Sequence, residues 1–316
     1  MLTDPLVELT PGPTLAVAAP ILAARSAVVA ALDDLLGVPD TTLELLWQWR
    51  RGDPPDEADV RYGFYRIHER LEEASAAIVD GRAGAGEGPG VGPAVALFGS
   101  ATAARWELRP AIAPLSQADL DRDPDGGEWT IRQTLGHIVQ GQRSYGWYSA
   151  WWLARGHAPG PLPERAGDAR MPEEPDELDE ASGGPDEIMA RLDELVDLAT
   201  GRFAGLTEDE LRTPALWSGL PVDIRFRIGR WGSHIREHTV QVDKTLAMIG
   251  RPSTEVERLA RLIGASYGRL ESLVIARSDA VLDRAWPDGG SATVVLESCA
   301  VDVRALAASV GAAARA

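Results

Sequence analysis

Apolar residues recur every three or four positions along most of the chain, the spacing that places them on one face of an α-helix. The pattern predicts helices near residues 14–37, 40–50, 57–80, 94–113, 130–155, 185–205, 223–249, 253–277 and 292–313. The alternation typical of strands is weak, and the apolar run at 294–296 is too short to indicate a strand by itself. We therefore expect an all-α protein.

Two of the predicted helices have well-marked ends. Thr130, with Gln133 three residues later, matches a capping box, so one helix should begin just after Trp129. Asp223 is a favourable N-cap for a later helix, and Gly250 suits the position after its last turn. Both helices should therefore hold their side chains on a stiff backbone.

Two stretches interrupt the helical pattern and divide the chain. Residues 83–93 are rich in glycine and proline, which is typical of a flexible linker. Residues 156–185 are rich in proline and acidic side chains and indicate a long solvated loop. We expect an N-terminal helical region over 1–82, a helical bundle over 94–250, and C-terminal helices over 251–316 that could pack with the N-terminal region.

Composition narrows the class of partner. The 316 residues include 31 Lys and Arg against 48 Asp and Glu, a net charge of −17, which argues against nucleic acid or an anionic membrane as partner. The charge says nothing specific about a substrate, and the small-molecule substrate that we expect rests on the histidines described below. The single cysteine, Cys299, excludes an intrachain disulfide and fits a cytoplasmic protein. The first residues lack the basic region of a secretory signal, and the apolar stretch 14–24 is too short to span a bilayer.

Three of the five histidines lie at positions from which they could all coordinate one metal ion. His137 lies in one predicted helix, and His234 and His238 lie four residues apart in another, so that their rings share a face. Imidazole is a common ligand of zinc, nickel and iron, and three protein ligands with an open position describe a working metal site. His68 and His157 are expected to be ordinary core or surface histidines.

The helix faces that carry the three histidines are polar, although a helix face packed inside a bundle is usually apolar. Either these faces point to water or they converge on a wet cleft, and the histidines favour a cleft. Arg227 and Arg230 could hold a carboxylate or a cofactor there, together with Gln133 and Gln140. The aromatic residues that follow His137 are expected to form core or a homodimer contact, with a substrate cage as the less favoured alternative: Tyr145, Trp147, Tyr148, Trp151 and Trp152.

The string from His234 to His238 also matches the H-x-x-E-H motif of inverted zincins, in which Glu237 would be the general base of a peptidase. That scheme needs an acidic third ligand, and no clear downstream helix offers one. Glu237 could instead act as an acid–base group or support a metal ligand. We expect Glu237 and Arg230 to be catalytic residues of the three-histidine site, with a chemistry other than that of a peptidase.

Three segments together resemble the DinB superfamily, which includes mycothiol-dependent maleylpyruvate isomerase-like proteins. They are residues 115–120, the Trp-Thr block and histidine of 128–137, and the His234-x-x-x-His238 helix. The resemblance covers about residues 93–250 and implies an antiparallel four-helix bundle with additional N- and C-terminal helices. It also implies a divalent metal near one end of the bundle, held by His137, His234 and His238.

The resemblance further implies a class of activity. Members of known activity are often metal-dependent transferases or isomerases that use a low-molecular-weight thiol such as mycothiol, bacillithiol or glutathione. A metal-activated water would make the same ligands a hydrolase, and a saturated metal would make them structural. The residues alone do not distinguish these three chemistries, and they leave zinc, nickel and iron open.

Overall fold

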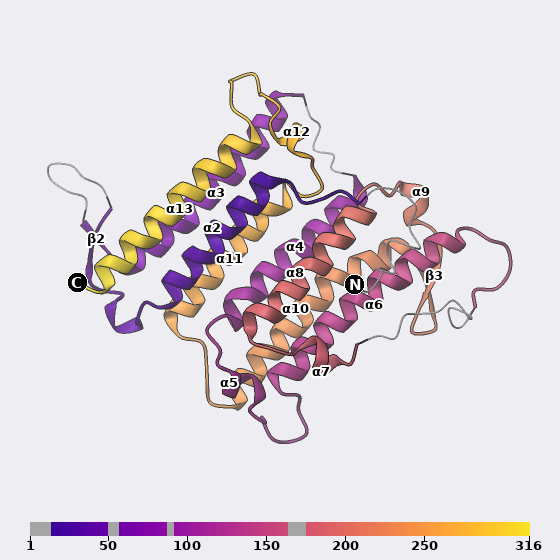
Figure 1. Ribbon diagram of the computed structural model, residues 1–316, viewed down its shortest axis with the longest axis horizontal. Coiled ribbons are helices and arrows are strands. Elements are labelled where there is room, and N and C mark those ends of the chain that lie inside the picture. Colours follow the sequence, from indigo (N-terminus) through magenta and orange to yellow (C-terminus); the bar gives the residue numbers. More distant parts are fainter. Residues whose placement is uncertain (1–13, 50–56, 87–91, 164–174) are drawn as a thin grey trace. The chain divides into compact units, whose positions relative to one another are not determined.

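The computed structural model describes residues 14–49, 57–86, 92–163 and 175–316 (Figure 1). The chain is mostly helical, as its hydrophobic pattern predicts. Its contacts divide it into two compact units, and helix α4 (Pro93–Ile112) contributes to both. The first unit comprises residues 1–16, 90–105 and 115–250, and the second comprises 17–89, 106–114 and 251–316.

Four long helices build the first unit. They are α4, α6 (Ile131–Arg155), α8 (Pro185–Phe203) and α10 (Ile224–Met248), and they pack as a helical bundle (Figure 1). Short elements connect them: α5 (Gln117–Asp121), α7 (Glu177–Glu180), α9 (Glu208–Leu211) and a hairpin of β3 (Pro214–Trp217) with β4 (Leu220–Asp223).

Aromatic and charged side chains show how these helices run. Phe98 of α4 stacks on Phe203 near the end of α8, with ring centroids 6.2 Å apart, whereas Arg105 of α4 pairs with Asp197 farther back along α8. Helices α4 and α8 are therefore antiparallel. Gln142 of α6 donates to the carbonyl oxygen of Trp231 early in α10, while the start of α6 lies beside the end of α10, so this pair is antiparallel too.

Local sequence signals set the ends of the two helices that matter most. The Thr130 side chain accepts from the Gln133 amide at 3.1 Å, and the Gln133 side chain accepts from the Thr130 amide at 2.9 Å, which confirms the predicted capping box. The Asp223 carboxylate accepts from the amide of Phe226 at 2.8 Å and caps α10 as predicted. Gly250, with φ of 72°, follows α10 in the left-handed conformation that glycine adopts readily.

The second unit has its own apolar core between four helices. They are α2 (Ala19–Leu36), α3 (Val60–Gly84), α11 (Glu255–Ser272) and α13 (Ala292–Ala314), together with the short α12 (Asp279–Leu282). Helix α13 packs against α2 and α3, and α11 packs against both as well. The fully buried carboxylate of Glu271 accepts from Arg25 at 2.8 Å and from the Trp106 indole at 3.0 Å, so this polar group inside the core is satisfied.

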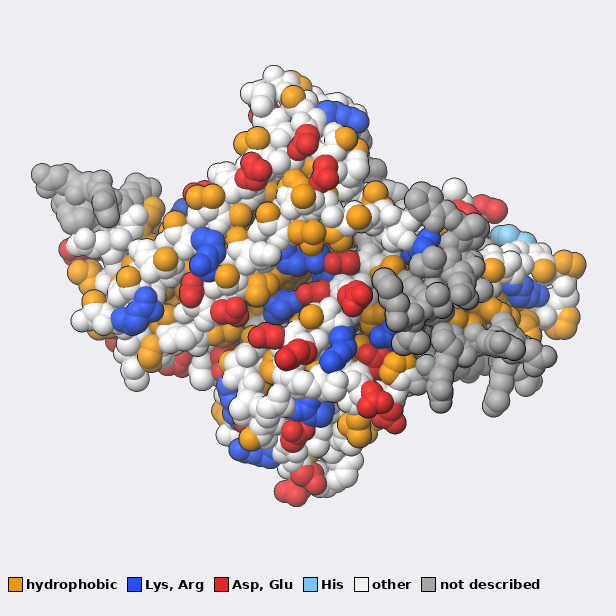
Figure 2. Space-filling view, in the orientation of Figure 1, with side chains coloured by type: hydrophobic (Ala, Val, Ile, Leu, Met, Phe, Trp, Pro, Cys, Tyr) orange, Lys and Arg blue, Asp and Glu red, His pale blue; other side chains and the backbone are white. Residues whose placement is uncertain are grey.

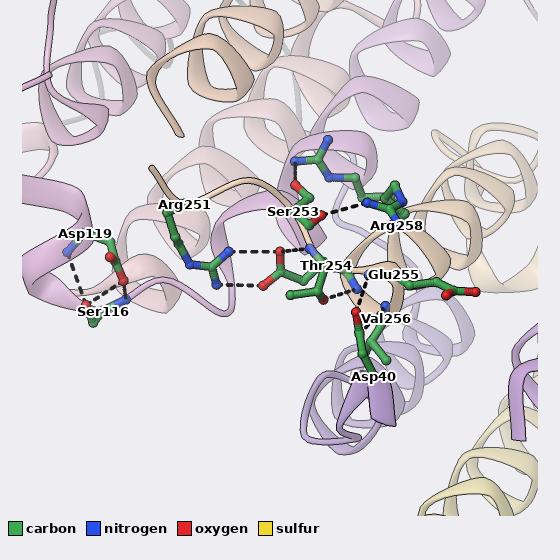
Figure 3. Close-up of polar contacts among 11 residues, drawn as sticks. Asp40, Ser116, Asp119, Arg251, Ser253, Thr254, Glu255, Val256 and Arg258 are labelled. Carbon is green, nitrogen blue, oxygen red and sulfur yellow. Dashed lines mark hydrogen bonds and ion pairs between the residues drawn. The ribbon is translucent and has the colours of Figure 1, made fainter. Parts of the chain in front are cut away.

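The helix predicted near residues 40–50 is wrong. A 3-10 turn, η1 (Asp40–Thr42), is followed by strand β1 (Leu46–Gln48), which pairs antiparallel with β2 (Glu57–Asp59). The Asp40 carboxylate accepts from the amides of Glu255 and Val256 at 2.8 and 2.9 Å and so caps α11 (Figure 3). Trp47 is buried and donates to the Ser309 hydroxyl at 3.0 Å. These long-range contacts outweigh the local helical pattern.

The acidic stretch before α8 also differs from the prediction of a solvated loop. Residues 164–174 lie outside the described part of the chain, but 177–180 form helix α7 against α6. Glu180 is buried and pairs with Arg143, with Nη2 and Oε2 3.2 Å apart. A Cβ on Gly136 would lie 2.0 Å from the Glu177 carbonyl oxygen, so glycine at this position lets α7 approach α6 closely.

Other sequence-based predictions concern chain segments and surface. Two of these predictions fall outside the described residues: the linker, of which residues 87–91 are not described, and the absence of a secretory signal, which concerns residues 1–13. None of the described helices has the length and apolar composition that crossing a membrane requires. Acidic and basic side chains are interspersed on the face shown in Figure 2. Cys299 is a buried free thiol, and burial raises its pKa to about 11.

Candidate metal centre

His137, His234 and His238 come together between α6 and α10. Their ring centroids are 5.1 Å apart for His137 and His234, 4.8 Å for His137 and His238, and 4.4 Å for His234 and His238. One ligand atom from each lies within 4.8 Å of the others, so the cluster could bind a metal ion. The other two histidines have different surroundings: His68 contacts Ser266, and His157 lies near an acidic residue of α9.

Hydrogen bonds orient the rings. The Nδ1 atom of His137 lies 2.8 Å from the carboxylate of Glu177, and the Nδ1 atom of His238 lies 2.8 Å from the side-chain oxygen of Gln241. Because both partners are acceptors, these Nδ1 atoms carry protons and the Nε2 atoms remain free as ligands. The Nε2 atoms of His137 and His234 lie 3.3 Å apart.

Electrostatics keep two of the imidazoles neutral. Burial, and then the charges that His238 and His137 would carry, lower the pKa of His234 to about 3. Burial also lowers the pKa of His238, against the raising effect of its hydrogen bond to Gln241. A neutral imidazole is the form that binds metal, so these side chains can bind at neutral pH without first losing a proton to solvent.

The donor set fits a divalent metal. Two nitrogens bound tetrahedrally, each about 2.0–2.1 Å from zinc, lie about 3.3 Å apart, which is the spacing already present between His137 and His234. Nitrogen-only ligation suits zinc, nickel and iron. Gly141 makes room for the cluster, because a Cβ there would lie 2.7 Å from the Cε1 atom of His234.

A cavity of about 570 Å³ opens beside the cluster. Its wall includes all three histidines, side chains of α6 and α10, and the β3–β4 hairpin. Ser218 and Gly219 form the two-residue turn of that hairpin, and both have positive φ, as this kind of turn requires. The polar faces predicted from sequence thus converge on a cleft: Gln140, Arg227 and Arg230 line it, whereas Gln133 serves the capping box at the start of α6.

The two arginines of the cavity have different surroundings. Arg230 donates to both carboxylate oxygens of Glu237, at 2.7 and 2.8 Å, and this pair raises the pKa of Arg230 and lowers that of Glu237. A carboxylate held this way is a weak proton acceptor, which disfavours the inverted-zincin interpretation. Arg227 is buried, and its Nη1 donates to the carbonyl oxygen of Leu216 at 2.7 Å.

Sequence reasoning missed several parts of this site. Glu177 lay in a stretch interpreted as solvated loop, and only its acidity could have suggested a partner for histidine. The hairpin carried one weak signal, the Ser-Gly pair at 218–219. Of the aromatic residues after His137, Trp147 and Trp152 are buried as expected, whereas Tyr145 and Tyr148 line the cavity, and Trp152 borders it as well.

Comparison with known proteins agrees with this geometry. The family model described as DinB superfamily matches residues 101–242, a range that contains the three clustered histidines and most of the bundle. No curated protein and no solved structure gives a significant match to the chain. The motifs, the helical bundle and the family match therefore identify residues 101–242 of this chain as a DinB superfamily domain.

Proposed function

We propose that the DinB domain binds one divalent metal ion through His137, His234 and His238 and uses it to activate a low-molecular-weight thiol for transfer to, or isomerisation of, a small-molecule substrate. The observation that carries this proposal is the convergence of three imidazoles on the wall of a cavity of about 570 Å³. A purely structural metal would more commonly have a fourth protein ligand and no adjoining cavity.

The proposed metal ligation rests on the orientation of the histidine rings. Glu177 and Gln241 hold two of the rings with Nε2 free, and partners of this kind commonly raise the affinity of a site for metal. A divalent ion bound there would lower the pKa of a coordinated thiol or water and so supply a nucleophile at neutral pH. The thiol itself is inferred from the family resemblance and from the size of the cavity.

The remaining polar residues of the cavity would position the reactants. Arg230 keeps its charge at any physiological pH, and its bidentate pair with Glu237 fixes the guanidinium beside the histidines. We assign to Glu237 the role of a positioning residue that acts through Arg230. Gln140 lines the same cavity and offers both a donor and an acceptor to a polar cofactor.

The metal is tested by elemental analysis of the full chain purified without an affinity tag. We expect about one equivalent of zinc, nickel or iron in the wild type and none in the His234→Ala/His238→Ala variant. His157→Ala is the matched control, because that histidine lies outside the cluster, and it should retain the metal. A wild type that takes up no metal after reconstitution with each ion would contradict the proposal.

The thiol is tested with the cobalt-substituted protein. Addition of mycothiol, bacillithiol or glutathione should produce a thiolate-to-cobalt charge-transfer band, and the alanine double variant should not produce it. A thiol that binds should then be consumed in a reaction with an electrophilic substrate. A metal-loaded protein that gives no such band and hydrolyses its substrate in the absence of thiol would favour the hydrolase instead.

A further inference from the structure

Arg227 is a buried charge that has no acidic partner among the described residues. It is only 4% exposed and lines the cavity next to the histidine cluster. Its Nη1 donates to a backbone carbonyl, and its Nε is buried and makes no hydrogen bond within the described part of the chain. No Asp or Glu among the described residues forms an ion pair with it, and burial lowers its pKa to about 10. A buried charge of this kind is costly unless an anion compensates it.

Arg105, another buried arginine of the same unit, and the partly buried Arg230 are both compensated. Arg105 is 1% exposed, and it pairs with Asp197 at 2.8 Å and Asp193 at 3.6 Å. Arg230 is paired with Glu237. These two arginines therefore have carboxylate partners supplied by the chain itself. Arg227 has no such carboxylate within the described ranges, and it lines the cavity, where a ligand can provide one.

Charge and shape indicate the kind of ligand. The pair of Arg230 and Glu237 is neutral, so Arg227 leaves one uncompensated positive charge at its end of the cavity, which suits a carboxylate better than a doubly charged phosphate. The guanidinium lies over the ring of Tyr148, 5.3 Å from its centroid. Trp152 and Trp217 add apolar surface to the wall of the same cavity. This environment fits a flat or apolar body that ends in a carboxylate.

The position of Arg227 also sets the length of the ligand. Arg227 and His234 lie seven residues apart on one face of α10, which corresponds to about 10 Å along the helix axis at 1.5 Å per residue. A molecule held at both ends would carry its carboxylate about that far from the atom that reaches the histidine cluster.

We propose that Arg227 is the anion subsite of this cavity and binds the carboxylate of a small organic monocarboxylic acid whose other end extends to the three histidines. This inference rests on the proposed function only for that second end. The anion subsite belongs to Arg227 and its surroundings and should bind without metal.

The test compares two probes of the same shape on the full chain treated with EDTA. Isothermal titration calorimetry should show that 3-phenylpropanoate binds at least ten-fold more tightly than its uncharged analogue 3-phenylpropanamide. The variant Arg227→Gln should lose this preference, while Arg225→Gln should keep it, because Arg225 is a more exposed arginine of the same helix that pairs with Glu208. The wild-type comparison alone decides the question if Arg227→Gln fails to fold.

Three results would overturn the inference: equal affinity for the two probes in the wild type, no binding of either probe, or an unchanged preference in folded Arg227→Gln. Tighter binding of inorganic phosphate than of 3-phenylpropanoate would overturn the assignment to a monocarboxylate. Repeating the titration with zinc separates the two proposals. If the protein prefers the carboxylate but takes up no zinc, the proposed anion subsite stands and the proposed metal centre fails. If it takes up zinc but shows no preference for the carboxylate, the metal centre stands and the anion subsite fails.

Discussion

Replacing Glu177 by alanine should weaken metal binding although Glu177 is not itself a proposed ligand. Its carboxylate accepts a hydrogen bond from Nδ1 of His137 at 2.8 Å and thereby holds the ring with Nε2 toward the other two histidines. Without it, His137 can rotate and can place its proton on either nitrogen. Some of the molecules would then present the wrong atom to the metal.

The expected magnitude follows from the exposure of the pair. Loss of such a partner typically costs 10- to 100-fold in metal affinity, and water can partly replace Glu177 because the His137 and Glu177 side chains are 30% and 37% exposed. We therefore expect the low end, about ten-fold, or about 1.4 kcal/mol. The variant Glu177→Gln keeps an acceptor but loses the charge, so about a three-fold loss is expected for it.

The assay is a competition titration of zinc against a chromophoric chelator at pH 7. Asp179→Asn is the matched control, because Asp179 is an exposed acid of the same short helix. The substitution removes one negative charge from nearly the same place as Glu177→Ala does. Circular dichroism should show that all variants remain folded. The reasoning fails if Glu177→Ala binds zinc within a factor of two of wild type, or if Asp179→Asn weakens binding equally.

Three further predictions concern the cluster and the bundle. The unfolded state takes up a proton on His234 below about pH 6.5 while the folded state, with a pKa of about 3, does not, so metal-free protein should lose stability as pH falls through this window. Urea unfolding at pH 7 and pH 5 should show about 2 kcal/mol more loss for wild type than for His234→Gln, and equal losses would contradict the shift. Gly141→Ala should lower zinc affinity at least ten-fold, because its Cβ would lie 2.7 Å from the His234 ring, and unchanged affinity in the same titration would show that the ring can move aside. Arg105→Met removes the buried guanidinium that pairs with Asp197, so urea unfolding should show a loss of about 3 kcal/mol with zinc affinity unchanged; a stability equal to wild type would mean that the ion pair contributes nothing.

Some features of the fold could be predicted because they depend on neighbours in sequence. In the capping box of Thr130 and Gln133 and at the N-cap Asp223, each side chain binds a backbone amide three residues away. The helical periodicity located the long helices for the same reason. The four-residue spacing of His234 and His238 placed both rings on one side of α10.

The failures have the opposite cause. Asp40 and Trp47 lie in a stretch with helical periodicity, but they bind groups more than two hundred residues away, at the start of α11 and on α13. Glu180 appeared to be one acid among many until its partner Arg143 was known. A local pattern contains no information about contacts of this kind.

The sequence by itself determined the helical class of this protein, the ends of the helices beside the site and the three histidines that form the cluster, because helix geometry converts short spacings into shared faces. Only the tertiary structure decided that Glu177 orients His137, that the β3–β4 hairpin closes one side of a cavity, and that Arg227 faces that cavity with no carboxylate from the described part of the chain beside it. These features require segments far apart in the chain to meet, and the balance of charge and burial at each one exists only after they have met.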